Sequence, residues 1–324
     1  MQESIQSDLV STIIPVFNRP DLIRRAVASV LSQTYRPIEI LLVDDGSTDN
    51  TPDVLFELRE SFPNVIRVIR QENGGAGLAR ENGRIASRGG FIQYLDSDDY
   101  LLPNKFTDQI AALQLHPECA IAYGTSSHVH VDGRVLEFPS RYTAHKIKTL
   151  FPLLLAQRWW HTHTPLFRRW ICDAVGSWPD FRPEDWDLEA RMGALNPQLI
   201  HCGSVVSVQV DHDSDNRVTR GPSIRALRDQ AIFLPRLFSA AVLAGVPSNA
   251  PEWLQFSDEC FVRARQLHHV GDSTSATVLL HLAELSSPHN SRLIRCYSLL
   301  ISLVGPWLGV RLAELLRTKL RLHA

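Results

Sequence analysis

Apolar and polar residues alternate in blocks along residues 1–100, and the blocks predict strands and helices in turn. Short apolar runs, typical of buried strands, are separated by segments in which apolar residues recur at helical spacing. We predict strands over residues 10–16, 38–43, 65–69 and 91–95, and helices over residues 20–33, 52–60 and 76–87. Such alternation with short connections predicts an α/β fold with a mostly parallel sheet and helices on both faces.

The remainder of the chain follows a different pattern. Residues 120–210 mix short strand-like runs, such as 199–210, with aromatic-rich loops, and from residue 224 onward the pattern is helical. We therefore expect one α/β domain over residues 1–220, with halves 1–100 and 101–220, and a helical region over residues 221–324.

Polar or glycine-rich clusters follow each of the four predicted strands. They are Asn18-Arg19, Asp44-Asp45-Gly46-Ser47, Asn73-Gly74-Gly75 and Asp96-Ser97-Asp98-Asp99. Ligands of parallel sheets lie outside the carboxyl ends of the strands, so these clusters predict one site. Carboxylates this close together repel one another unless a cation lies among them, and oxygen ligands suit Mg²⁺ or Mn²⁺. The alternative for the acidic cluster alone is a polar turn that caps the next helix.

Composition narrows the class of protein. The chain has 324 residues and a formal net charge of −2, which gives no general attraction to nucleic acid. Its five cysteines are scattered singly, which argues against a disulfide framework and a structural zinc site. The polar N-terminus lacks a signal-peptide pattern, and the apolar stretch 296–310 is shorter than the roughly 20 residues of a membrane span. We expect a cytoplasmic protein.

Four motifs in this order resemble those of glycosyltransferase family 2, whose members have the GT-A fold and use nucleotide-diphosphate sugars. The motifs are Ile14-Pro-Val-Phe-Asn-Arg19, Asp44-Asp-Gly-Ser-Thr-Asp49, Glu72-Asn-Gly-Gly-Ala-Gly-Leu-Ala-Arg80 and Asp96-Ser-Asp-Asp99. The resemblance covers roughly the first 220 residues. It implies a metal-dependent, inverting transfer of a sugar, with a UDP-linked donor as the expectation, in polysaccharide, O-antigen or glycolipid synthesis.

The resemblance also implies roles for residues around the nucleotide. Pro15, Phe17 and Arg19 would hold the nucleotide, although Phe17 is equally consistent with core packing. Asp44 or Asp45 would accept hydrogen bonds from base and ribose, and the alternative for either is a turn before Gly46. Three further positions complete the predicted nucleotide-sugar site: Gly75 where the backbone approaches the ligand, Arg80 toward phosphate or ribose, and Ser97. The alternative for Arg80 is a solvated helix face.

The acidic cluster resembles the Asp-x-Asp metal motif of this fold. Asp98 and Asp99 are the predicted contacts of Mn²⁺ or Mg²⁺, and Asp96 is expected to face the sugar or ribose. His212 lies where some relatives place a further metal ligand. The metal would neutralise the diphosphate and stabilise the leaving group.

A second family signature, Gly176 to Arg191, supplies the candidate general base. Pro183 fits the first helical position, which puts Glu184 and Asp185 in the first turn. Asp185 is the predicted base and Glu184 the second candidate. The alternative is ordinary stabilisation of the helix dipole by first-turn acids.

The predicted partners are a nucleotide-diphosphate sugar and a glycan or lipid-linked acceptor, with no nucleic acid. Trp159 and Trp160 resemble the acceptor wall, where they would stack on a sugar or lie at the core edge. Basic residues and a leucine stripe over 291–324 suit a helix at the inner face of a membrane, or one docked on the domain or on a second subunit. The rival functions are a nucleotidyltransferase, which usually has a glycine-rich loop after the first strand, and a non-catalytic binding scaffold.

Overall fold

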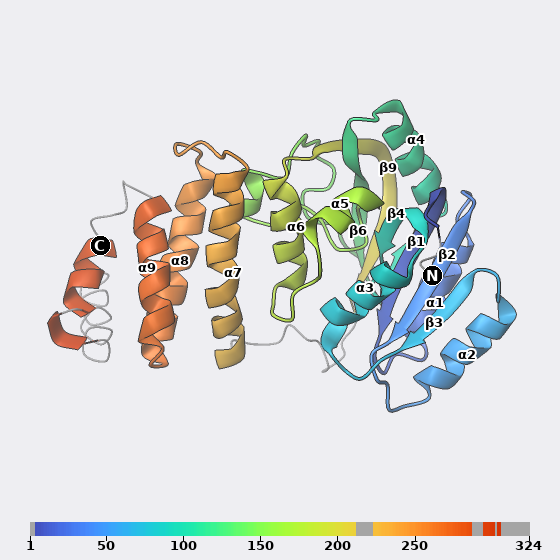
Figure 1. The fold of residues 1–324 in the computed structure, drawn as a ribbon, viewed down its shortest axis with the longest axis horizontal. Helices are drawn as coiled ribbons and strands as arrows, with labels where there is room; N and C mark the ends of the chain where they lie inside the picture. The colour runs from blue at the N-terminus through green and yellow to red at the C-terminus, as the bar shows by residue number, and fades with distance from the viewer. Residues whose placement is uncertain (1–3, 212–222, 287–293, 302, 306–324) are drawn as a thin grey trace. The chain divides into compact units, whose positions relative to one another are not determined.

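The computed structural model describes residues 4–211, 223–286, 294–301 and 303–305 (Figure 1). The chain divides into two compact units, and each is described by itself. The first lies within Met1–Leu150, Arg158–Asp180 and Asn196–Asn216, and the second within Phe151–Gln157, Phe181–Leu195 and Arg217–Ala324. The helical unit thus takes two segments, 151–157 and 181–195, from within the predicted α/β region, and the boundary near residue 220 stays a prediction.

The first unit is built on one mixed sheet with the strand order β3-β2-β1-β4-β8-β6-β9-β5, and β7 pairs with β6. Strands β3, β2, β1 and β4 are mutually parallel, as are β6 and β9, whereas β8, β5 and β7 pair in antiparallel fashion. The strands are β1 (Gln6–Val16), β2 (Ile38–Asp44), β3 (Ile66–Arg70), β4 (Gly89–Tyr94), β5 (Tyr100–Leu101), β6 (Cys119–His130), β7 (Val135–Glu137), β8 (Leu166–Arg168) and β9 (Gln198–Asp211).

Helices cover both faces of this sheet, as the buried strands require. The helices of the first unit are α1 (Leu22–Leu31), α2 (Thr51–Ser61), α3 (Gly75–Ala86), α4 (Lys105–Leu115) and α5 (Arg169–Val175). Alternate residues of β1 and β2, such as Ile14 and Leu42, share a core with the apolar faces of α1, α2 and α4. Ile13 and Val43 point the other way, toward Gly83 of α3. The predicted α/β class with a mostly parallel sheet in its first half is confirmed.

Element bounds agree with the sequence pattern to within two residues except at β1, which begins at Gln6, four residues before the predicted strand. Helix α2 begins at Thr51, and Asn50 is its N-cap. The Thr51 hydroxyl accepts a hydrogen bond of 2.9 Å from the backbone N–H of Arg19. The start of α2 is thereby linked to the loop after β1.

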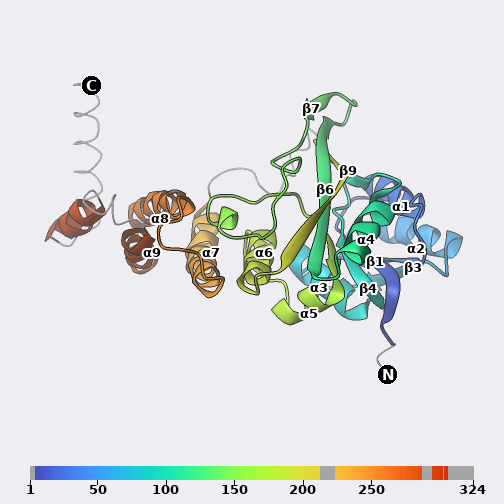
Figure 2. The ribbon, with the colours of Figure 1, turned by 90° about the horizontal axis from the view of Figure 1, so that it is seen from above.

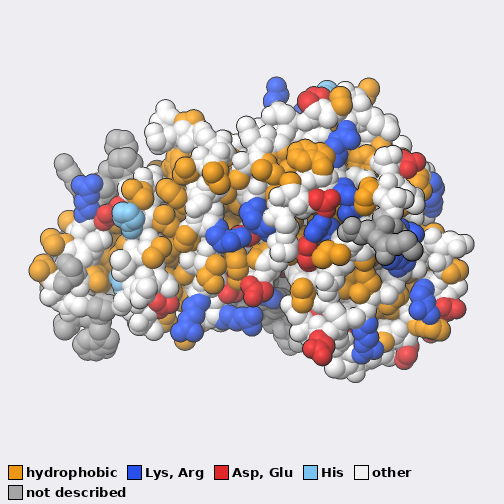
Figure 3. Space-filling model, viewed as in Figure 1, with side chains coloured by type: hydrophobic (Ala, Val, Ile, Leu, Met, Phe, Trp, Pro, Cys, Tyr) orange, Lys and Arg blue, Asp and Glu red, His pale blue; other side chains and the backbone are white. Residues whose placement is uncertain are grey.

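The second unit is helical, as predicted for the C-terminal region. It contains the 3-10 turn Leu153–Leu155 and the helices α6 (Glu184–Ala194), α7 (Ile224–Leu243), α8 (Glu252–His269) and α9 (Ser273–Ser286). Hydrophobic side chains lie between charged ones on the face of these helices shown in Figure 3. Within the part of the chain that the structure describes, no helix has the length and apolar character that a membrane span needs.

A buried glutamate joins the first strands to the loop before β4. Glu39 is 1% exposed, and its carboxylate accepts hydrogen bonds of 2.6 Å from Ser11 Oγ and from the backbone N–H of Arg88. Arg88 Nε also donates at 3.0 Å, and Arg67 lies 3.6 Å away. A buried carboxylate is stable only with such partners, and these contacts link Glu39 of β2 to β1, to β3 and to the residue before β4.

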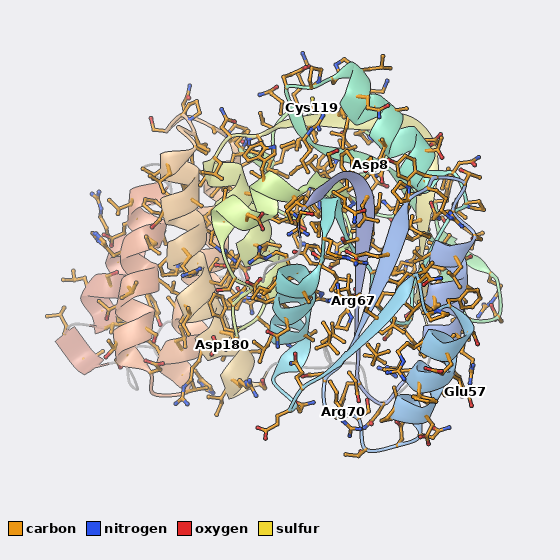
Figure 4. The ribbon with its side chains drawn as sticks, turned by 45° about the vertical axis from the view of Figure 1, so that its right-hand side comes forward. Asp8, Glu57, Arg67, Arg70, Cys119 and Asp180 are labelled. Atoms are coloured by element: carbon orange, nitrogen blue, oxygen red, sulfur yellow. The ribbon has the colours of Figure 1, made fainter. Side chains whose placement is uncertain are left out.

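We expect Glu39→Ala to lower the free energy of unfolding by about 3–5 kcal/mol, because it leaves buried polar partners without their acceptor. The matched control is Glu57→Ala, which removes the exposed ion pair with Arg24 and should cost about 0–1 kcal/mol (Figure 4). Urea unfolding of both variants checks this. Equal losses would show that the Glu39 network contributes no more than a surface pair.

Candidate active site

The loops after β1 and β2 are tied together at the carboxyl edge of the sheet. The backbone N–H of Asn18 donates to Ser47 Oγ at 3.0 Å, and the N–H of Thr48 donates to Asn18 Oδ1 at 2.9 Å. Asn18 has a positive φ of 51°, which turns the chain sharply after the strand. Phe17, next to it, is 44% exposed, so it is not a core residue and its ring is available to a base. Pro15 is buried within β1.

The two adjacent aspartates after β2 have different surroundings. Asp45 is fully engaged, since its Oδ1 accepts from Gln71 Nε2 and the N–H of Gly74, and its Oδ2 from the N–H of Gly75, each at 2.8 Å. Asp44 is also buried, but among the described residues only its Oδ1 accepts a hydrogen bond, from the N–H of Ser47 at 2.9 Å.

Asp44 Oδ2 lies 3.5 Å from Arg70 Nε and has no hydrogen-bond partner among the described residues. Arg70, labelled at the end of β3 in Figure 4, has a side chain that is 60% exposed. A buried carboxylate oxygen left in this way favours a ligand N–H or O–H as its partner. The geometry therefore favours Asp44 as the nucleotide acceptor and Asp45 as the residue that holds the glycine loop.

Gly75 begins α3 in a conformation that favours glycine, with φ of 88°. Its N–H is used by Asp45, so this loop is shaped by the protein itself. Arg80, one turn later, is 5% exposed, which excludes the solvated helix face. Its Nη2 donates to Asp96 Oδ1 at 2.6 Å, and its guanidinium lies 4.7 Å from the centre of the Trp178 ring. Contact of Arg80 with a phosphate stays a prediction.

Asp96 remains ionised because of Arg80. Burial acts to raise the pKa of Asp96, but the charge and hydrogen bond of Arg80 outweigh it, and the pKa falls below its usual value. Trp178, which contacts the Arg80 guanidinium, also packs edge-on against the ring of Tyr94, with centroids 4.9 Å apart. Ser97, the next residue of the turn, is 9% exposed.

The last two aspartates of the cluster differ in accessibility. Asp99 is 5% exposed, its Oδ1 accepts from the N–H of Val210 at 2.8 Å, and its Oδ2 lies 2.8 Å from His163 Nδ1. Burial raises the pKa of Asp99, although His163 opposes the shift. Asp98 is only partly buried, and its backbone carbonyl is held by Arg25 of α1 at 2.6 Å. This arrangement favours Asp98 for metal contact, whereas Asp99 connects the acidic turn to β9 and to His163.

Metal binding by these residues stays a prediction. Among the residues that the structure describes, no group of three or more His, Cys, Asp or Glu side chains is arranged to hold a metal ion. The donors at hand, the partly exposed carboxylates of Asp96 and Asp98, suit a hard divalent cation that shares its shell with phosphate and water. His212 lies outside the described residues.

The candidate base belongs to the second unit. Helix α6 begins at Glu184, so Pro183 is the residue before the helix and not its first member. Asp185 is partly exposed, and its Oδ1 accepts a 2.8 Å hydrogen bond from the N–H of Trp186. Asp187, buried in the same turn, pairs with Arg191 at 2.8 Å and with Arg236 of α7, which fixes α6 against α7. The base roles of Asp185 and Glu184 stay predictions.

The sequence analysis gave no role to three residues that contact the acidic cluster or Arg80, namely Arg25, His163 and Trp178. It also predicted that Trp159 and Trp160 either stack on a sugar or lie at the edge of the core. The structure shows both in the core. Trp160 is fully buried against Tyr123, with ring centroids 5.1 Å apart, and Trp159 is 7% exposed. His163 of the same segment is fully buried, and His161 is partly buried.

The model of the family described as glycosyl transferase family 2 matches residues 11–171. Residues 11–171 form a family 2 glycosyltransferase domain. This segment contains all four motifs on which the prediction rested, and the predicted family is confirmed for it.

Curated relatives of this domain are also named as glycosyltransferases. The chain is 36% identical over 159 residues to a Rickettsia typhi protein named as a glycosyltransferase, covering 48% of this chain and 49% of that protein. It is 41% identical over 101 residues to the glycosyltransferase GlyG of Streptococcus pneumoniae, covering 30% and 33%. The chain thus spans at most about half the length of these curated relatives.

Solved structures share the fold of the glycosyltransferase domain and of the helical region. One is Staphylococcus aureus TarS residues 1–349 with UDP, at a TM-score of 0.63 and 17% identity over 88% of this chain and 87% of that one. Another is the mannosyltransferase PcManGT of Pyrobaculum calidifontis with GDP-Man and Mn²⁺, at a TM-score of 0.53 and 15% identity over 94% and 86%. The predicted GT-A fold is confirmed.

Proposed function

We propose that this chain is a metal-dependent inverting glycosyltransferase, which moves a sugar from a nucleotide-diphosphate sugar to an acceptor hydroxyl. The observation that carries the proposal is that, in each pair of adjacent aspartates at the sheet edge, one aspartate holds a loop and the other has a different role. Asp45 and Asp99 hold loops in place, while Asp44 keeps a buried oxygen without a hydrogen-bond partner among the described residues, and Asp98 is partly exposed. Such an arrangement supports ligand binding because the loops are preorganised around the remaining carboxylates.

Each group then has a task that its surroundings permit. Asp44 accepts hydrogen bonds from the base or ribose, and Phe17 provides a flat apolar surface for the base. Asp96, ionised beside Arg80, accepts from a hydroxyl of the ribose or the sugar. Asp98 would hold Mn²⁺ or Mg²⁺, which supplies charge neutralisation for the diphosphate when it is bound.

The remaining step is proton removal from the acceptor. Asp185, at the start of α6, takes the proton from the acceptor hydroxyl while the acceptor oxygen forms a bond to the anomeric carbon of the sugar. The bond from that carbon to the diphosphate oxygen breaks on the opposite face, so the configuration inverts. We further propose that the acceptor is a glycan or a lipid-linked saccharide and that the reaction occurs in the cytoplasm or at the inner membrane face.

Calorimetric titration of the full chain with UDP and then GDP, each with and without Mn²⁺, tests this proposal. We expect one nucleotide to bind, at least about tenfold more tightly with Mn²⁺, which corresponds to about 1.4 kcal/mol. The solved relatives with UDP and with GDP-Man make both nucleotides reasonable probes. Absence of binding by either nucleotide would contradict the proposed donor site.

A further inference from the structure

Tyr142 presents an exposed ring on a buried support. It lies in the segment after β7, where the β6–β7 hairpin extends from the rest of the first unit (Figure 2). The Tyr142 ring stacks on Trp159, with centroids 5.4 Å apart and planes at 27°. Tyr142 is 45% exposed whereas Trp159 is 7% exposed, so the tryptophan supports the tyrosine ring without competing for its solvent side.

The turn that carries Tyr142 is held by hydrogen bonds on both sides. Ser140 Oγ lies 2.8 Å from His161 Nε2, and the N–H of Ser140 donates to the carbonyl of Ser126 at 2.7 Å. Thr143 Oγ1 donates to the Ser140 carbonyl at 2.8 Å and accepts from the N–H of Ser126 at 2.9 Å. The ring is therefore ordered before any ligand arrives, which lowers the entropy lost on binding.

The same segment leads to the acidic cluster. His161 stacks on His163, with ring centroids 5.6 Å apart and planes at 15°, and His163 Nδ1 is the group 2.8 Å from Asp99 Oδ2. Two histidine rings thus link the Tyr142 turn to the turn that contains Asp98. All of these residues belong to the first unit.

We propose that Tyr142 is a stacking platform for one sugar of a glycan acceptor, at a subsite beyond the sugar that receives the transferred group. A pyranose has an apolar C–H face that matches an aromatic ring, and hydroxyls at its rim that need polar partners. The polar side chains next to Tyr142 in sequence are Arg141, whose Nε donates to His161 Nδ1 at 3.2 Å, and the exposed residues His145 and Lys146, and these are the candidate partners for the rim hydroxyls. The inference rests on the proposed function, because only a transferase needs an acceptor at this position.

Saturation-transfer NMR on the full chain tests the platform with defined probes, namely chitotetraose, cellotetraose and mannotetraose with their monosaccharides. We expect at least one tetrasaccharide to bind more tightly than its monosaccharide. Tyr142→Ala should weaken that binding about tenfold, and Tyr142→Phe, which keeps the ring, should retain it. Phe56→Ala, which removes an aromatic ring of 55% exposure from α2, is the matched control and should bind as the wild type does.

Three outcomes would overturn the platform: no tetrasaccharide bound by the wild type, equal binding by Tyr142→Ala, or equal loss in Phe56→Ala. Sedimentation with phosphatidylglycerol vesicles adds a fourth, since vesicle binding that Tyr142→Ala abolishes would assign the surface to lipid. The wild type is titrated in parallel with UDP and GDP in the presence of Mn²⁺. Nucleotide binding without tetrasaccharide binding refutes the platform alone, whereas absence of nucleotide binding refutes the proposed function.

Discussion

Replacing Asp98 by asparagine is expected to lower the release of nucleoside diphosphate from the nucleotide sugar by about 100- to 1,000-fold. The substitution keeps the size of the side chain but removes the charge that would hold a divalent cation. It should also abolish the Mn²⁺-dependent part of UDP or GDP binding. The fold should survive, since the contact from Arg25 is made to the backbone carbonyl of Asp98.

Asp53→Asn is the matched control for this experiment. Asp53 is an exposed aspartate in the first turn of α2, in the same unit as Asp98. It should leave both nucleotide release and calorimetric binding at the wild-type level. An Asp98→Asn protein that transfers sugar at the wild-type rate, or that keeps Mn²⁺-dependent nucleotide binding, would refute the metal assignment.

Much of the first unit could be predicted because β1, β2 and β4 are largely buried on both faces. Strands β1 and β2 are apolar over most of their lengths, and Asp44 lies at the end of one of them. The position of each polar cluster at a strand end then follows from the parallel arrangement. This is why the gathering of these polar clusters at one edge of the sheet could be predicted from residue order, whereas their nucleotide roles came from the family resemblance and stay predictions.

The distribution of roles within each cluster could not be predicted in the same way. Asp44 and Asp45 are adjacent and chemically identical, but Asp44 is bonded within its own loop, by Ser47, and Asp45 by the loop after β3. Asp99 likewise gains its partners from β9 and from the segment before β8, which are remote in sequence. Long-range packing decides which carboxylate is engaged, and no local pattern encodes it.

The helical unit shows a second limit of prediction from the sequence. Residues 151–157 and 181–195 lie between strands of the first unit in sequence, yet they belong to the second. Their hydrophobic positions find partners in later helices: Trp186 packs against Phe233 of α7 with centroids 5.3 Å apart, and its Nε1 donates to the Leu154 carbonyl at 3.0 Å. A periodic pattern shows that such residues are buried but not against which element.

Replacing Asp185 by asparagine should lower kcat by about 100- to 10,000-fold, the range for loss of a general base, with KM for the nucleotide sugar unchanged. The change is nearly isosteric, and the hydrogen bond from the Trp186 N–H can be made to the amide oxygen. Asp187 holds α6 against α7 through Arg191 and Arg236, so the helix should stay in place. Steady-state kinetics with the donor chosen by calorimetry gives both constants.

Glu184→Gln is the comparison that separates a base from an ordinary helix-start acid. Both carboxylates lie in the first turn of α6, so loss of either removes a similar stabilisation of the helix dipole, about 0.3–1 kcal/mol. If both carboxylates only stabilise the helix dipole, the two substitutions should have small and equal effects on kcat. If Asp185 is the base, kcat should fall strongly in Asp185→Asn alone. A large loss confined to Glu184→Gln would transfer the base to Glu184. A wild-type kcat in both variants would place proton removal on another group.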